Sequence, residues 1–480
     1  MGFIDRLRLG DAFDVRDGTH DSPKYQECGY PLVTSKNIYN GVLDLSNIKY
    51  ISEEDHLKIS ERSKVDRGDI LFAMIGSIGN PVIIDIEPNF SVKNVGLFKY
   101  YDPKQSNPKY LQYYLMLAEK WFKEESTGAV QSFVSLGKLR SFPFPVAPLK
   151  EQDSIVAKVD ELMALCDQLE QQTEASLTAH QTLVETLLNT LLNADQNSFD
   201  QAWERIAQHF DVLFTTEHSI DQLKQTILQL AVMGKLVPQD PNDESASVLL
   251  EKIATEKEQL IKDKVIKKQK PLPPISEDEK PFELPKGWEW VRPDEFSIKI
   301  TDGEHFKPPT TEKGVFFLSA KDIRSEGVSL ESPLYISEKT AEKALSRCDP
   351  KFGDLLIVSR GATVGRMCKV EISDVFCLLG SVILIKPTKL VLSDYISIAL
   401  KSPASFEQLI NASASTAQPA IYLRDLKKMV LPIPPIKEQR RIVTKVGELL
   451  DLCDTLKTHI SESQTIQLHI ADVMAEQALV

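Results

Sequence analysis

Apolar residues recur at helical spacing in two segments of the chain. After a proline-rich stretch that ends at Pro148, the spacing alternates between four and three residues, as at the a and d positions of a coiled coil. A second proline-rich stretch, near residue 434, is followed by the same pattern. The two apolar stripes are Ile155, Val159, Leu162, Cys166 and Leu169, and Ile442, Val446, Leu449, Cys453 and Leu456. We predict two long helices, at 149–193 and 437–480, whose stripes pack against each other.

The chain contains an internal repeat that extends beyond these helices. Residues 145–169 and 432–456 are identical at 15 of 25 positions, with a constant offset of 287. Earlier landmarks also match, namely Asp17-Gly18-Thr19-His20 with Asp302-Gly303-Glu304-His305, and Gly68-Asp69 with Gly353-Asp354. Between the landmarks the two blocks differ strongly. A duplicated scaffold with two different specificities would give this pattern, and neutral drift in surface loops is the alternative.

The two blocks, residues 1–148 and 291–436, have the pattern of mixed α/β domains. Short strand-like runs lie between glycine-rich turns, at 70–75, 81–86, 355–359 and 376–385. One amphipathic helix is expected in each block, near 107–123 and 392–410. The central segment, 194–290, should contain a helix that begins at a Ser219/Gln222 capping box and ends at Gly234, then a charged helix at 246–264 and a proline-rich linker.

Composition narrows the class of protein. The 480 residues are 42% hydrophobic and 26% charged, which predicts several folded domains rather than disorder. The longest apolar run is about ten residues, half of what a bilayer span needs. A charged start argues against a signal peptide, and six cysteines without a Cys-x-x-Cys pair argue against a zinc site or a disulfide framework. We therefore expect a cytoplasmic protein with no membrane segment.

The net charge of −13 is unevenly distributed. Residues 146–290 carry 14 basic and 26 acidic side chains, whereas residues 1–145 carry 18 and 19, and residues 291–436 carry 19 and 17. The two blocks are therefore almost neutral. Whole-chain acidity gives no argument against a nucleic-acid partner for them.

No catalytic or metal-binding constellation is evident. The chain lacks a G-x-x-x-x-G-K-[ST] phosphate loop. The strings nearest to a methyltransferase motif and to a nuclease cluster, Asn107-Pro108-Lys109-Tyr110 and Asp294-Glu295 with Lys299, match poorly. The eight histidines are scattered, without cysteine or carboxylate neighbours at metal-ligand spacing.

Polar loop residues provide candidates for nucleic-acid contacts. Glycine-rich turns follow a strand in both blocks, at 75–80 and 360–366, and such turns can direct backbone N–H groups at an anion. A tight hairpin whose arginines stay in solvent is an equally good interpretation. The candidate residues are His20, Lys24, Lys36, Asn37, Ser77, Asn80, His305, Lys307, Lys321, Arg360, Thr363 and Arg366.

In combination these motifs resemble the specificity subunit of Type I restriction–modification enzymes. The resemblance rests on the Asp-Gly-x-His openings, on GDILFAMIGSIG and GDLLIVSRGATVG, and on the two Lys-Glu-Gln helix heads that follow the prolines. It also includes ILQLAVMGKLVPQDPNDESA and PFELPKGWEW in the central segment. The similarity covers nearly the whole chain.

The resemblance implies an α+β architecture, in which two target-recognition domains are separated by two long antiparallel coiled-coil helices. Each domain would read one half of a bipartite, asymmetric site in double-stranded DNA. The subunit itself would be non-catalytic and bind no cofactor. It would assemble with two modification subunits and with restriction subunits, and those partners would use S-adenosylmethionine, ATP and Mg²⁺.

Two other functions remain open on sequence grounds. The chain could be a stand-alone methyltransferase or nuclease with unrecognised motifs. It could also be a structural coiled-coil organiser that reads no DNA sequence.

Overall fold

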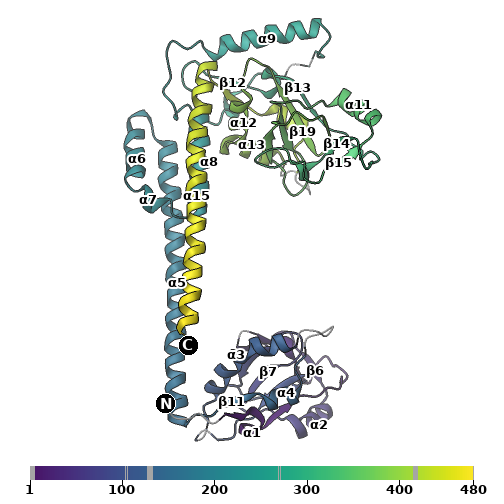
Figure 1. Cartoon of the computed structure of the whole chain (residues 1–480), viewed down its shortest axis with the longest axis vertical. Coiled ribbons are helices and arrows are strands. Elements are labelled where there is room, and N and C mark those ends of the chain that lie inside the picture. The colour runs from purple at the N-terminus through teal and green to yellow at the C-terminus, as the bar shows by residue number, and fades with distance from the viewer. Residues whose placement is uncertain are drawn as a thin grey trace. The chain divides into compact units, whose positions relative to one another are not determined.

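The computed structural model describes residues 6–39, 41–102, 104, 106–126, 133–268, 270, 272–413 and 420–478. The chain divides into two compact units, residues 1–175 and 176–480. Each unit contains one globular domain and part of the long helix α5 (Leu149–Asn193). The second unit also contains the central segment and the C-terminal helix α15 (Ile436–Ala478) (Figure 1).

The first domain is built on a four-stranded antiparallel sheet in the order β2-β10-β7-β8. A smaller sheet has the order β6-β3-β9, in which β9 runs parallel to β3. Strand β1 pairs with β11, and β4 pairs with β5. The strands are β1 (Arg6–Arg8), β2 (Val15–Asp17), β3 (Tyr30–Val33), β4 (Ile38–Tyr39), β5 (Val42–Leu43), β6 (Lys49–Ile51), β7 (Ile70–Ala73), β8 (Gly79–Ile83), β9 (Ser91–Val92), β10 (Val95–Phe98) and β11 (Pro143–Pro145). The helices are α1 (Leu9–Ala12), α2 (Glu53–Ser63), α3 (Pro108–Glu125) and α4 (Leu136–Ser141), with a 3₁₀ turn at Ser35–Asn37.

The second domain has the same topology. Its four-stranded sheet has the order β13-β19-β16-β17, its three-stranded sheet has the order β15-β14-β18, and β12 pairs with β20. The strands are β12 (Glu289–Val291), β13 (Ser297–Asp302), β14 (Val315–Leu318), β15 (Leu334–Ile336), β16 (Leu355–Val358), β17 (Met367–Lys369), β18 (Phe376–Leu378), β19 (Val382–Pro387) and β20 (Leu431–Ile433). The helices are α10 (Pro293–Phe296), α11 (Glu338–Arg347), α12 (Ser393–Lys401), α13 (Pro403–Ser413) and α14 (Leu423–Lys428), with a 3₁₀ turn at Ala320–Asp322. The predicted duplication of a mixed α/β scaffold is confirmed.

Helix α3 shows how the local sequence produces these elements. Asn107 caps the helix by accepting a hydrogen bond from the Lys109 amide, and Pro108 occupies the first turn, where its missing N–H costs nothing. Leu111, Leu115 and Phe122 lie on one face of the helix and are buried in the core of the domain. The fully buried strand β7 contributes Phe72 to the same core.

Two predicted elements are each divided in two by the structure. The expected helix at 392–410 is interrupted at Ser402, because Pro403 removes the residue before it from helical geometry and begins α13. The apolar run at 376–385 is not one strand. It contains β18 and β19, which belong to different sheets, with Gly380 in the connection.

The central segment is helical, as predicted, with one corrected boundary. Its helices are α6 (Gln196–Gln208), α7 (Phe210–Leu213), α8 (Glu217–Val232) and α9 (Ala246–Lys262), followed by a 3₁₀ turn at Glu277–Glu279. Thr216, not Ser219, is the N-cap of α8, and Ser219 completes the capping box from within the helix. Gly234 follows the end of α8 with a φ of +68°, a conformation that glycine adopts without steric cost.

The apolar stripe of α15 is buried by α8, which lies along it (Figure 1). Ile442, Val446 and Cys453 are 0%, 2% and 3% exposed, whereas Leu449 and Leu456 are half-buried at the same core. Ion pairs flank the seam, with Lys457 contacting Asp221 at 2.8 Å.

The corresponding stripe of α5 lies in the first unit, which leaves it largely exposed. Ile155, Leu162 and Leu169 are 38%, 50% and 61% exposed, Cys166 is exposed and Val159 is half-buried. The α5 stripe lies in the first unit and the α15 stripe in the second, so the packing of the two stripes against each other stays a prediction. Only the last turns of α5, at Val184, Leu188 and Leu191, enter the buried cluster that contains α8.

One glutamine attaches each domain to the start of its long helix. The Gln152 side chain donates to the Ala147 carbonyl (2.7 Å) and accepts from the Asn107 amide (2.9 Å), at the N-terminus of α3. Gln439 makes the same two bonds in the second domain. It donates to the Pro434 carbonyl and accepts from the Leu392 amide, both at 3.0 Å. Both glutamines are buried, so the Lys-Glu-Gln motif is a structural clamp.

The glutamates before these glutamines have different surroundings. Glu438 is buried and accepts a hydrogen bond of 3.0 Å from the Trp288 indole N–H, supplied by the central segment. Burial raises the pKa of the Glu438 carboxyl, and the hydrogen bond from Trp288 partly opposes that shift. Glu151, at the corresponding position, is exposed.

None of the helices in the described part of the chain has a stretch both long and apolar enough to span a bilayer.

We predict that replacing Gln152 or Gln439 with alanine destabilises the attached domain. Each replacement leaves a buried carbonyl without its donor and a partly buried N–H without its acceptor, a loss of about 1–3 kcal/mol in the free energy of unfolding. Urea unfolding of the full chain measures it, and Gln171→Ala on the exposed surface of α5 is the control. Equal changes in the three variants would contradict the clamp.

Candidate nucleic-acid interface

The Asp-Gly-x-His motif forms the loop after the first strand of each four-stranded sheet. In the first domain the Gly18 and Thr19 amides donate to the carbonyls of Val95 and Val92, both at 3.0 Å. A Cβ atom at Gly18 would lie 2.3 Å from the Val92 carbonyl oxygen, so only glycine fits at this distance. Gly303 is held in the same way, with a Cβ position 2.0 Å from the Leu378 oxygen. Steric contact with the neighbouring strand thus explains the glycine of both copies.

The aspartate of the motif organises a cluster in the first domain. Asp17 is buried, and its carboxylate contacts the ring Nε2 of His20 at 2.9 Å and pairs with the guanidinium of Arg62, at the end of α2. The second ring nitrogen of His20 contacts Asn94 Oδ1 at 2.9 Å. His20 and Arg62 themselves remain largely exposed.

An equivalent cluster occurs in the second domain. Arg347, at the end of α11, donates to Asp302 at 2.5 Å and to the ring Nε2 of His305 at 2.7 Å. Asp302 lies 3.8 Å from the same ring nitrogen. The offset of 285 between Arg62 and Arg347 equals that between the two Asp-Gly-x-His motifs. Both copies therefore combine a shielded aspartate with an exposed histidine and arginine.

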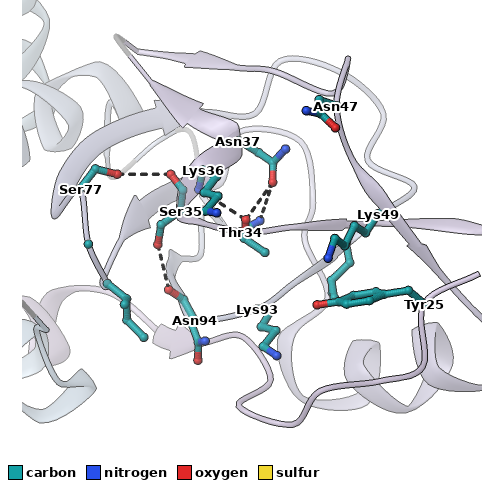
Figure 2. Close-up of a pocket in the computed structure, with 13 residues that line it drawn as sticks. Tyr25, Thr34, Ser35, Lys36, Asn37, Asn47, Lys49, Ser77, Lys93 and Asn94 are labelled. Carbon is teal, nitrogen blue, oxygen red and sulfur yellow. Dashed lines mark hydrogen bonds between the residues drawn. The ribbon is translucent and has the colours of Figure 1, made fainter. Parts of the chain in front are cut away.

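A pocket of about 520 Å³ opens beside this cluster in the first domain (Figure 2). Three lysines, Lys36, Lys49 and Lys93, contribute to its wall, and none of the described lining residues is acidic. Lys49 Nζ lies 4.2 Å from the centre of the Tyr25 ring. The other polar lining residues are Thr34, Ser35, Asn37, Asn47, Ser77 and Asn94. Lysine, asparagine and an aromatic ring are suited to contacts with phosphates, base edges and base faces.

Hydrogen bonds connect three of the segments that line the pocket (Figure 2). Ser35 Oγ donates to the Asn94 carbonyl at 3.4 Å, and Ser77 Oγ donates to the Ser35 carbonyl at 3.5 Å. Asn94 therefore connects the pocket to His20, because its carbonyl accepts from Ser35 and its side chain contacts the His20 ring.

Asn37 has a structural role in this wall. Its Oδ1 accepts from the Thr34 amide and hydroxyl, both at 3.0 Å, and its Nδ2 donates to the Asp44 carbonyl at 3.1 Å. Asp322 closes the same turn in the second domain by accepting from Ser319. Of the two Lys-Asn/Asp pairs, only Lys36 and Lys321 are exposed.

Strand pairing identifies the equivalents of the pocket residues in the second domain. Lys49 pairs with Leu32 in the first domain, and Leu334 pairs with Phe317 in the second. Lys93 forms a parallel bridge with Thr19, and Leu379 forms the equivalent bridge with Glu304 in the second domain. Ile75 and Arg360 are likewise equivalent, in bridges to Phe133 and Ala420. The second domain therefore loses two pocket lysines and gains an arginine.

Arg360 lies at a surface rich in arginine and tyrosine. Its guanidinium carbon is 6.0 Å from the centre of the Tyr422 ring, and that of Arg424 is 5.2 Å from the same ring. Arg360 and Arg366 are both exposed, and Thr363 between them is half-buried.

The remaining candidates lie apart from these groups or at their edge. Lys24 and Lys307 are exposed in the loops after the Asp-Gly-x-His motifs. The backbone N–H of Asn80 donates to the Glu119 carboxylate of α3 at 2.6 Å, and Asn80 is not among the residues that line the pocket.

Sequence analysis missed Lys49, Lys93, Asn94, Arg62 and Arg347. The first three have no counterpart in the repeat, so nothing in a single sequence distinguishes them. Arg62 and Arg347 were detectable, because they share the offset of 285 with the motif that they contact.

No described residues form a group of three or more His, Cys, Asp or Glu side chains that could hold a metal ion. Burial raises the pKa of the Cys348 thiol to about 12 and that of the Cys368 thiol to about 11, so neither is an activated nucleophile at neutral pH.

Comparison with known proteins identifies the family. The sequence model of the type I restriction modification DNA specificity domain matches residues 5–179 and 285–463, which include both globular domains. The chain belongs to this family.

Two curated members of the family from Escherichia coli are similar to the chain. The type I restriction enzyme EcoAI specificity subunit is 43% identical over 347 residues, which are 70% of this chain and 58% of that protein. The EcoEI specificity subunit is 39% identical over 387 residues, or 76% and 63% of the two chains. The matches thus span about three fifths of the length of these relatives.

A solved structure shares the fold. A chain from a structure of a type I R-M system, described for its complex assembly and conformational transition, aligns with a TM-score of 0.53 at 17% identity. The alignment covers 99% of this chain and 97% of that chain.

We predict that Gly18→Ala disrupts the first domain. The added methyl group would meet the backbone of β9, and relieving that contact should lower the free energy of unfolding by about 1–3 kcal/mol or more. Hydrogen–deuterium exchange of β2 and β9 should increase. Gly137→Ala in α4, where the nearest atom is 3.9 Å away, is the control and should be neutral or slightly stabilising. Similar exchange in both variants would contradict this account.

Proposed function

We propose that the chain is the DNA-sequence-reading subunit of a type I restriction–modification complex. Each globular domain reads one half of a bipartite, asymmetric DNA site. One observation supports this most directly. The two domains share one topology and differ at equivalent pocket positions, as in Lys49 against Leu334 and Ile75 against Arg360. Such a pair can bind DNA in the same way and select different bases.

The subunit is proposed to be a non-catalytic adaptor. Two modification subunits and the restriction subunits bind to it, and the chemistry belongs to them. The modification subunits use S-adenosylmethionine to methylate adenine, and the restriction subunits use ATP and Mg²⁺ to translocate and cleave DNA. The long helices set the spacing between the two half-sites, as the geometry of a dimeric DNA reader sets its half-site spacing.

Exchange of the second domain tests the division of labour. Residues 291–430 are replaced with the corresponding block of another family member, and the chimera is assembled with the modification subunit. Methylated positions are then mapped by sequencing. We expect one half of the methylated sequence to change and the other to remain. Two unchanged halves would refute the assignment, as would DNA methylation or cleavage by the isolated chain.

Lys49→Leu tests the pocket of the first domain with the residue that the second domain carries at the equivalent position. We expect discrimination at one base pair of the first half-site to fall by about 1–3 kcal/mol, roughly ten- to a hundredfold. Methylation rates of the assembled complex on single-base variants of the site measure the change. Lys58→Ala, at an exposed position on α2, is the control. Unaltered preference in the first half-site would exclude Lys49 as a base-reading residue.

A further inference from the structure

The Asp–His–Arg cluster is retained in both domains, although the surface around it differs. Asp17, His20 and Arg62 correspond to Asp302, His305 and Arg347. Asn94, which contacts His20, is replaced by Gly380, where an added Cβ would lie 3.2 Å from the His305 ring. The cluster therefore keeps both its place and its residues in the two domains, whereas the residues of the adjoining pocket differ.

We propose that Arg62 and Arg347 each bind a phosphate of the DNA backbone, beside His20 and His305, and that Asp17 and Asp302 are positioning residues that hold these side chains at the DNA. The proposal rests on the proposed function and adds to it the residues that dock each domain on DNA independently of sequence.

The exposure of the cluster is graded in a way that suits this role. The side chains of Asp17 and Asp302 are 5% and 13% exposed, whereas those of Arg62 and Arg347 are 63% and 41% exposed. One edge of each guanidinium is held by the carboxylate. Arginine has five N–H donors in a rigid fork, so donors remain for a second anion at the exposed edge. The arginines are largely solvated, so each carboxylate offsets only part of the charge, and the remaining N–H donors can make charge-assisted hydrogen bonds to a phosphate.

Stability alone is a weak reason for keeping both arginines. Each aspartate is shielded from water, so losing its arginine costs stability, but any cation that reaches the carboxylate would prevent that loss, and it need not be an exposed arginine. Side chains that read bases must differ between domains with different targets. Phosphates are common to every target, and contacts to them carry no sequence information. A cluster shared by two otherwise divergent surfaces fits the phosphate contact.

The test uses the full chain assembled with its modification subunit. Binding to a duplex containing the methylated site, and to a duplex with that site scrambled, is measured by fluorescence anisotropy over a series of salt concentrations. The variants are Arg62→Ala and Arg347→Ala. Lys58→Ala and Lys343→Ala, at equivalent exposed positions of α2 and α11, are the controls.

We expect each arginine variant to reduce the slope of log K against log salt by about one, and to weaken binding to both duplexes by the same factor, roughly tenfold. Arg62→Lys should keep most of the slope and lose part of the affinity, because it keeps the charge without the fork. Asp17→Asn should weaken binding in a variant that retains Arg62. Thermal unfolding of each complex checks that it is folded.

An unchanged slope in Arg62→Ala and Arg347→Ala would overturn the inference, as would a loss confined to the specific duplex, which would indicate base reading. If Arg62→Ala does not fold, Arg62→Lys replaces it, and an affinity equal to that of the unaltered complex would overturn the inference for the first domain. Failure of the proposed function gives a different result, because the unaltered complex would then bind the two duplexes equally.

Discussion

The structure depends on two buried glutamine side chains, each of which joins a globular domain to its long helix. A primary amide supplies a donor and an acceptor on one short, stiff group, and Gln152 and Gln439 use both on the backbone, at a buried carbonyl and a partly buried N–H. Substitution leaves a buried polar atom unsatisfied, which is more costly than the bond is stabilising. This explains why the helix heads remain nearly identical while the domains diverge. The clamp fixes how a domain begins its helix and leaves the far surface of that domain free to change.

A second repeated feature protects the interior of each domain. Lys99 bonds to Asp69 at 2.5 Å, and Lys386 bonds to Asp354 at 2.8 Å. The two aspartates are equivalent, because they directly precede β7 and β16. Loss of one member of a buried pair costs about 3–5 kcal/mol, because the other charge stays behind without water. The Gly-Asp landmarks of the sequence are therefore structural. The two domains diverge at positions outside these pairs, such as Lys49 and Leu334.

Sequence reasoning recovered the duplication, the topology class and the long helices, because each follows from periodicity or from residues shared at a fixed offset. It failed where tertiary contacts decide. The apolar periodicity of 392–410 predicted one helix, whereas the structure has two, separated before Pro403. The apolar run 376–385 predicted one strand, whereas its halves belong to different sheets. In the site, nothing in the sequence indicated that the Asn37 side chain bonds to Thr34 and Asp44 within its own loop. Arg62 lies far in sequence from the motif that it contacts, and only the repeat offset connects them.

The two apolar stripes show most clearly what a pattern leaves undetermined. Cys166 and Cys453 occupy the same position of nearly identical sequences, but of the two only Cys453 lies in the unit that contains α8. Cys453 is 3% exposed there, in the buried cluster to which α8 contributes Ile220, Leu223 and Ile227. An apolar stripe specifies that a helix face gains free energy from being covered, at about 25 cal/mol per Å². It does not specify the covering segment, because any amphipathic helix of suitable spacing satisfies it. In α15, charged residues beside the stripe favour α8 as the covering helix. There Lys457 pairs with Asp221 of α8, whereas α5 carries Glu170 at the matching position and would repel the same acidic edge.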